Sequence, residues 1–149
     1  MTNIENKEYE NFNTLYKELD KCYERFATFC GLPVSAMWII YSLRSDNTES
    51  ITQADISKRY FLNKQSVCSA IKKLEKDGYI TMLTMPDNAK NKPLRLTEKG
   101  IKLAEEKIDK LLAAEQATFE GLTIKEQMQF IKLYSKYVMA LKININSIR

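Results

Sequence analysis

The segment TQADISKRYFLNKQSVCSAIKKLEKDGYI, residues 52–80, decides the fold of this chain. Thr52 and Asp55 form a capping-box pattern, which predicts the start of a short helix. Asn63 is a good N-cap for a second helix, and this helix is expected to end at Gly78. Two helices joined by a short connector predict a helix-turn-helix.

The second helix of this pair has two chemically different faces. At 100° per residue, its apolar side chains gather on one side and its polar side chains on the other. The apolar face consists of Val67, Ala70, Ile71 and Leu74, and the polar face consists of Gln65, Cys68, Ser69, Lys72 and Lys76. We therefore expect the apolar face to dock the helix and the polar face to point outward.

A small β hairpin is predicted after this helix. Residues 80–85 (ITMLTM) have the composition of a strand, residues 86–92 form a polar turn, and Leu94–Leu96 can be the return strand. Pro93 has no amide hydrogen to donate, so the return strand should lie at an edge or begin after it. The hairpin adds a wing to the helix-turn-helix.

The flanking segments predict helices. Apolar residues recur at three- and four-residue spacing over residues 5–30, residues 34–44 indicate a short buried helix, and residues 97–119 indicate a longer one. A second capping box, Thr123 with Glu126, begins the last helix.

These elements predict a mainly α fold with a small β wing, in a single domain over residues 1–149. The winged helix DNA-binding lobe is expected at residues 34–96. Helical dimerisation regions are expected at residues 1–31 and 97–149, so the fold class is a winged helix-turn-helix with N- and C-terminal dimerisation helices.

The last helix carries an apolar pattern with a period of 3.5 residues: Ile131, Tyr134, Val138, Leu141, Ile145 and Ile148. A helix needs this period when it packs along its length against another helix. We predict a homodimer whose interface includes Phe12, Leu19, Ile131, Tyr134, Val138, Leu141 and Ile145. Packing of the first helix on the last within one chain is the alternative.

Charge and composition exclude several classes of enzyme. The chain has 149 residues, a net charge of +4 and no histidine, which excludes catalytic triads, histidine bases and zinc sites with histidine ligands. The four glycines are isolated, so there is no glycine-rich phosphate loop. We expect no catalytic residues, no metal and no cofactor, and the protein is not predicted to be an enzyme.

The positive charge is concentrated in the centre of the chain. Residues 53–95 contain nine lysines and arginines against four acidic residues, a net charge of +5, so the rest of the chain carries −1. A basic block is typical of a surface that binds a polyanion such as DNA, although a solvated lysine-rich face is the alternative. Gln65 can pair with adenine, Lys72 can reach guanine or phosphate, and Ser66 with the helix-start amides suits a phosphate oxygen.

Segment 52–80, together with the wing and Leu96-Thr97-Glu98-Lys99-Gly100, resembles the multiple antibiotic resistance regulator (MarR) family of bacterial transcription factors. The resemblance implies a dimer that binds double-stranded DNA at a pseudo-palindromic operator and represses a nearby promoter. It also implies release of the DNA when a small molecule binds. Carried over by position, residues 63–77 are the recognition helix.

The wing and the turn depart from the family pattern. The wing of the family usually has an arginine that enters the minor groove, and the best equivalent in this chain is Lys90, preceded by Asp87 or Asn88. Lysine keeps the charge and loses the planar fork, so phosphate contact is the expected role. Phe61 stands where a residue tolerant of positive φ is common, and it could instead pack on the core. The predicted DNA-binding residues are Asn63, Lys64, Gln65, Ser66, Cys68, Ser69, Lys72, Lys73, Lys90 and Lys92.

The sequence is compatible with two kinds of sensor, one that binds a small aromatic ligand and one that reacts with oxidants. Similar proteins bind small aromatic ligands between the dimer helices and the DNA-binding lobe, so candidate ligand-binding residues are Tyr16, Tyr23, Phe26, Trp38 and Tyr41. Ordinary core packing is the alternative for each. Cys22 and Cys30 are candidate redox residues, with Cys22 expected to be inert packing on the apolar stripe and Cys30 more exposed.

The cysteines and the hydropathy of the chain bear on its location in the cell. Three cysteines without a close pair and the absence of a secretory or membrane-spanning apolar run indicate a cytoplasmic protein with no membrane association. A winged helix that mediates protein interaction, or a regulator that senses oxidants through a thiol, are the alternatives to a ligand-released DNA-binding repressor.

Overall fold

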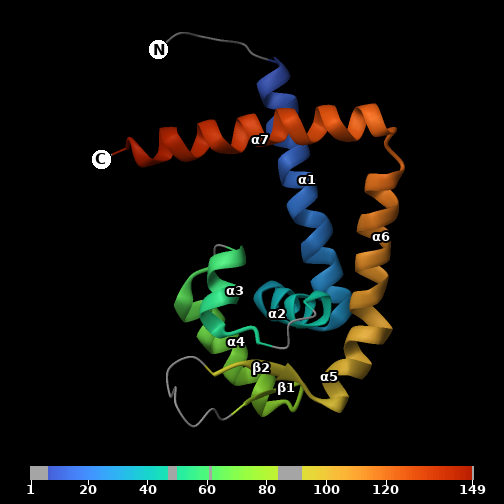
Figure 1. Ribbon diagram of the computed structural model, residues 1–149, viewed down its shortest axis with the longest axis vertical. Coiled ribbons are helices and arrows are strands. Elements are labelled where there is room, and N and C mark those ends of the chain that lie inside the picture. The colour runs from blue at the N-terminus through green and yellow to red at the C-terminus, as the bar shows by residue number, and fades with distance from the viewer. Residues whose placement is uncertain (1–6, 47–49, 61, 84–91, 149) are drawn as a thin grey trace. The chain divides into compact units, whose positions relative to one another are not determined.

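The computed structural model describes residues 7–46, 50–60, 62–83 and 92–148. The chain divides into two compact units, Met1–Asp109 and Lys110–Arg149, and each is considered by itself. Figure 1 shows the order of the elements along the chain. That order is α1 (Lys7–Cys30), α2 (Val34–Ser45), α3 (Gln53–Tyr60), α4 (Lys64–Lys76), β1 (Ile80–Met82), β2 (Leu94–Leu96), α5 (Glu98–Leu103), the π-helical turn η1 (Ala104–Ile108), α6 (Asp109–Glu120) and α7 (Ile124–Asn146). The mainly α fold with a small β wing is confirmed.

Helix α2 is the centre of the first unit. Met37, Ile39 and Ile40 are completely buried, and α2 packs against α1, α3, α4, β2 and η1. Its last turn is tied to the first residue of α6, because the Arg44 guanidinium donates two hydrogen bonds to the Asp109 carboxylate at 2.8 and 2.7 Å. These hydrogen bonds hold the pKa of Asp109 below its usual value.

The helix-turn-helix forms at the predicted residues. Helix α3 begins one residue after Thr52, whose hydroxyl accepts from the Asp55 amide at 3.2 Å while the Asp55 carboxylate accepts from the Thr52 amide at 2.9 Å. This is the reciprocal pair of bonds that a capping box requires. Helix α4 follows the connector, with Ile56 of α3 buried in the core. Phe61, the connector residue expected to be strained or packed, lies outside the described residues.

The wing is an antiparallel pair in which Ile80 faces Leu96 and Met82 faces Leu94. The first strand ends at Met82, before the predicted end at residue 85; residues 84–91 lie outside the described part. The return strand begins after Pro93, as expected for a residue without an amide donor. The Leu94 amide donates instead to the carbonyl of Ile51 at 2.7 Å, which attaches the wing to the start of the helix-turn-helix.

The single helix predicted over residues 97–119 is interrupted by a π-helical turn. Residues 104–108 form η1 between α5 and α6, and its two buried side chains are Ala104 and Ile108. The apolar spacing over this stretch does not distinguish an α turn from a π turn, because both keep the same side buried. In the second unit, the capping box of Thr123 and Glu126 begins α7 as predicted.

Candidate nucleic-acid interface

The start of α4 carries free backbone donors beside exposed polar side chains. Asn63 is the N-cap, and its side-chain oxygen accepts from the Gln65 amide at 2.8 Å. The first amides of a helix have no partner within it, and the positive end of the helix dipole favours an anion there. Lys64, Gln65 and Ser66 are all exposed at this end. The arrangement suits a phosphate oxygen next to side chains that can reach a base.

The two faces of α4 are separated as the sequence predicts. Val67 is completely buried, and Ile71 and Leu74 are each 2% exposed. The opposite face is open to solvent at Gln65, Ser69, Lys72 and Lys76, with Cys68 half-buried. Because the buried face anchors the helix on α2, the polar face is presented outward as a rigid row.

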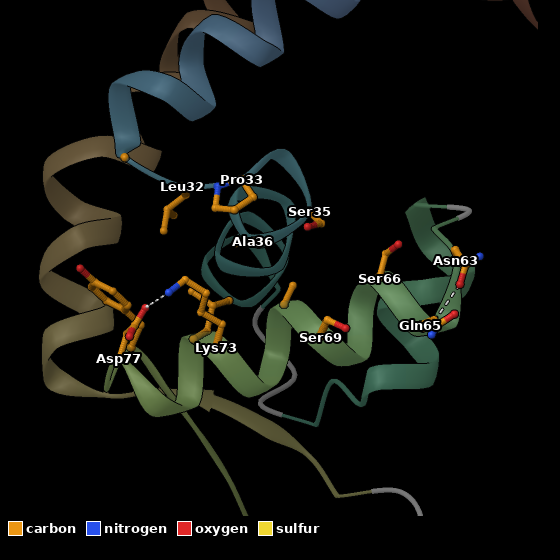
Figure 2. Close-up of a pocket in the computed structure, with 14 residues that line it drawn as sticks. Leu32, Pro33, Ser35, Ala36, Asn63, Gln65, Ser66, Ser69, Lys73 and Asp77 are labelled. Carbon is orange, nitrogen blue, oxygen red and sulfur yellow. Dashed lines mark hydrogen bonds and ion pairs between the residues drawn. The ribbon is translucent and has the colours of Figure 1, made fainter.

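A groove runs along one side of this polar face. It has a volume of about 650 Å³ and lies between the α1–α2 turn, the first turn of α2 and α4. Figure 2 shows Ser66, Ser69 and Lys73 of α4 on the side that faces Pro33 and Ser35. Sequence reasoning missed the α2 side of this groove, because only the three-dimensional packing of α2 on α4 brings residues 33–36 to the recognition helix.

The positive charge of α4 is largely solvent-exposed. Lys73 lies 3.5 Å from Asp77 in an exposed ion pair, which Figure 2 shows. Lys72 and Lys76 are also exposed. An exposed pair one helical turn apart contributes little to stability, so Lys73 can exchange Asp77 for another anion at low cost. The α4 surface is therefore suited to attract a polyanion.

The predicted DNA contacts of the wing fall mostly on residues outside the described ranges. Lys90, with Asp87 and Asn88, lies outside the described residues, and Lys92 is half-buried just before β2. The phosphate contact expected of Lys90 stays a prediction.

Three of the five candidate ligand-binding aromatics form a cluster around Trp38. Trp38 contacts Tyr23 at 4.8 Å and Tyr41 at 5.2 Å between ring centroids. Tyr60 of α3, which the sequence did not single out, stacks on Trp38 at 5.2 Å. The other two candidates have different ring partners: Tyr16 contacts Phe12, and Phe26 contacts Phe29.

The expected exposures of the two candidate redox cysteines were wrong. Cys22 is exposed and Cys30 is half-buried. The reason is that Ala27 is the buried residue of α1 within the described helix, so the apolar stripe that carries Cys22 is not covered in a single chain. Burial raises the pKa of the Cys30 thiol, and the nearby Lys107 ammonium lowers it by less. A raised pKa opposes formation of the reactive thiolate.

The predicted dimer-interface residues are mostly open to solvent in one chain. Phe12 and Val138 are half-buried, and the exposed members are Leu19, Ile131, Tyr134, Leu141 and Ile145. Ile148, the last residue of the 3.5-residue pattern, lies beyond the end of α7. On both α1 and α7, large apolar side chains therefore lie at the surface, which is unusual for a protein that works as a monomer.

The described ranges hold neither a cluster of metal-ligating side chains nor a single helix that could span a membrane. No group of three or more Cys, Asp or Glu residues that could hold a metal ion occurs there. No single described helix is long and apolar enough to cross a membrane. Helices α1 and α2 reach the required length and apolar composition only together, and they are bent by 83° at the break between them.

Comparison with known proteins finds a family whose sequence model matches the centre of the chain. The sequence model of the MarR family matches residues 31–82, which contain α2, the helix-turn-helix and β1. The HTH-type transcriptional regulator SarZ of Staphylococcus haemolyticus is 29% identical over 87 residues, which is 58% of this chain and 58% of SarZ. The chain thus spans a little over half the length of this curated relative.

Solved structures extend the likeness to nearly the whole chain. NMB1585, a MarR family regulator from Neisseria meningitidis, superposes with a TM-score of 0.80 at 18% identity, covering 95% of this chain and 99% of that one. MepR of S. aureus, in a MepR-DNA complex, superposes with a TM-score of 0.72 at 21% identity, covering 87% and 93%. Residues 31–82 thus match the sequence model of the MarR family, and nearly the whole chain shares the winged helix fold of NMB1585 and MepR.

Proposed function

We propose that the protein is a sequence-specific DNA-binding transcriptional regulator. The observation that carries the proposal is the exposed polar face of α4, a row of donors and acceptors on a helix whose other face is anchored in the core. An α helix presented in this way fits the major groove of DNA. The DNA complex of the structurally similar MepR supports the proposal.

The regulator is proposed to act as a homodimeric repressor at a pseudo-palindromic operator. Exposed apolar side chains on α1 and α7 support the dimer, because burying them against a second copy removes apolar surface from water. A two-fold symmetric dimer presents two copies of α4, and these would read two half-sites of a palindrome.

Binding to DNA is tested by a salt titration with a random-sequence duplex. The affinity should fall about tenfold or more between 50 and 200 mM salt, since lysines that neutralise phosphates release counterions. A flat response would refute DNA binding and favour a winged helix that mediates protein interaction.

The same assay, with a duplex selected by the wild-type protein, tests α4 as the reader. Gln65→Ala and Lys72→Ala should each weaken binding by about 1 to 3 kcal/mol, because each removes a side chain of the outward row. Both residues are exposed, so the circular dichroism spectrum and the melting temperature should not change. Lys132→Ala, which removes an exposed lysine from α7, is the matched control; equal losses in Lys72→Ala and Lys132→Ala would contradict the assignment.

Release by a small aromatic ligand is the remaining part of the proposal. Three of the five candidate residues, Tyr23, Trp38 and Tyr41, form one ring cluster with Tyr60. Trp38 is the only tryptophan of the chain, so its fluorescence emission should change when a phenolic compound binds the cluster. Release of DNA by a compound that leaves this emission unchanged would place the ligand elsewhere.

A further inference from the structure

The C-terminal end of α4 is held by the first turn of α5. We propose that Lys99 and Thr97 are positioning residues for DNA recognition, which act by fixing the orientation of α4. This inference rests on the proposed function for its effect on DNA, and on the contacts between α4 and α5 for its mechanical part. We call the contacts of Thr97 and Lys99 with residues 77–79 the α4–α5 clamp.

Lys99 supplies the hydrogen bond that the end of α4 lacks. Its Nζ donates to the carbonyl oxygen of Asp77, the C-cap residue of α4, at 2.7 Å. The same ammonium lies 4.4 Å from the centre of the Tyr79 ring. The last carbonyls of a helix have no partner within it, and a cation there is also favoured by the helix dipole. Lys99 therefore caps α4 from a different element of the chain.

Thr97 extends this capping to the next two carbonyls. Its Oγ1 donates to the carbonyl of Gly78 at 2.5 Å, and its amide donates to the carbonyl of Tyr79 at 3.0 Å. The same Oγ1 accepts from the Gly100 amide at 3.1 Å, because Thr97 is also the N-cap of α5. Three consecutive carbonyls after α4 thus accept from a single turn of α5, so the end of α4 and the start of α5 cannot move independently.

The position of the clamp explains why it would matter for specificity. The polar face of α4 is aligned by its apolar face and by its two ends, and Asn63 caps the other end. Base contacts need side chains placed to within about 0.5 Å, whereas phosphate contacts tolerate small rotations of the helix. A looser α4 should therefore lose affinity for its selected duplex and keep its affinity for unrelated DNA.

The first test compares two lysines of one helix. Lys99→Met removes the ammonium and keeps most of the aliphatic stem, while Lys102→Met removes the same charge from an exposed position on α5. The probes are the tightest duplex that the wild-type protein selects from a random library and a scrambled duplex of equal length. Lys99→Met should bind the selected duplex about tenfold more weakly than Lys102→Met, with equal affinities for the scrambled duplex. Equal affinities of the two variants for the selected duplex would overturn the positioning role.

The second test removes the hydroxyl without changing the shape. Thr97→Val should lose affinity for the selected duplex, and Thr97→Ser, which keeps Oγ1, should recover most of it. A loss by Thr97→Val that is the same on both duplexes would assign Thr97 a purely structural role and refute the inference for this residue.

Hydrogen exchange separates a failure of the clamp from a failure of the proposed function. The amides of Asp77, Gly78 and Tyr79 donate to carbonyls of the last turn of α4. These three amides should exchange faster in Lys99→Met and Thr97→Val than in Lys102→Met, while amides of α7 keep their rates. If the wild-type protein selects no duplex but this exchange pattern is found, the proposed function fails and the mechanical clamp stands. Unchanged exchange overturns the clamp whatever the DNA result.

Discussion

Replacing Gly100 with alanine is expected to lower the free energy of unfolding by about 3 kcal/mol. A Cβ at Gly100 would overlap the carbonyl oxygen of Tyr79 and come within 3.0 Å of its carbonyl carbon. Both atoms are backbone and belong to the α4–α5 clamp, so neither can rotate away. Thermal unfolding followed by circular dichroism should show a fall of about 6 to 12 °C in the melting temperature.

Gly31→Ala is the matched control for this prediction. Gly31 has a φ of +71° and nothing lies within 4 Å of an added Cβ, so alanine there costs only the strain of a left-handed backbone, about 1 to 2 kcal/mol. The two variants separate a steric clash from a conformational cost. A Gly100→Ala protein that is as stable as Gly31→Ala would show that α5 moves away from Tyr79 at a cost of only about 1 to 2 kcal/mol, and this result would weaken the case for the clamp.

The helix-turn-helix could be predicted from sequence because its signals are local. Thr52 with Asp55, Asn63, and the antiphase faces of α4 each specify structure within a few residues, and the structure has them where they were expected. The start of the return strand after Pro93 was predictable for the same reason, since a missing amide hydrogen is a property of one residue.

The parts that could not be predicted depend on contacts between distant segments. The α4–α5 clamp joins Lys99 to Asp77. The sequence predicted a helix from Thr97 onward, but it gave no sign that the start of this helix contacts the end of α4. The stacking of Tyr60 on Trp38 joins α3 to α2. Periodicity assigns a residue to a face of its own helix, but it does not say which other element covers that face.

The exposure of Cys22 illustrates the same limit at an interface. An apolar stripe predicts burial, yet it does not say whether the partner is the same chain or another copy. In the described chain the stripe of α1 stays largely open, so Cys22 is exposed where packing was expected. Helix α7 also has exposed apolar side chains outside the 3.5-residue pattern, and these are Met128, Leu133, Met139 and Ile143. The period alone did not predict this second set.

Replacing Val138 with aspartate is expected to convert the proposed dimer to monomers. Val138 is the central residue of the apolar stripe of α7, between Tyr134 and Leu141, and it is half-buried even in one chain. A carboxylate at this position would lie unpaired in an apolar interface, which costs several kcal/mol for each copy of the residue and appears twice in a symmetric dimer. Light scattering at micromolar concentration should therefore give half the wild-type mass.

Gln129→Asp adds the same negative charge to α7 on the side opposite the stripe, since nine residues at 100° each place Gln129 about 180° from Val138. This variant should keep the wild-type mass. Both variants should keep the helical circular dichroism spectrum, because neither position in α7 is fully buried in one chain and one aspartate costs a long helix little. Loss of the dimer should also reduce the affinity for a two-half-site duplex far more than for a single half-site, because the second α4 is no longer held at a fixed spacing.

An unchanged mass for Val138→Asp would show that the 3.5-residue stripe is not the dimer interface. Loss of the dimer in both variants would instead show that the partner copy contacts α7 on both sides. The exposed apolar residues outside the stripe would then also belong to the interface.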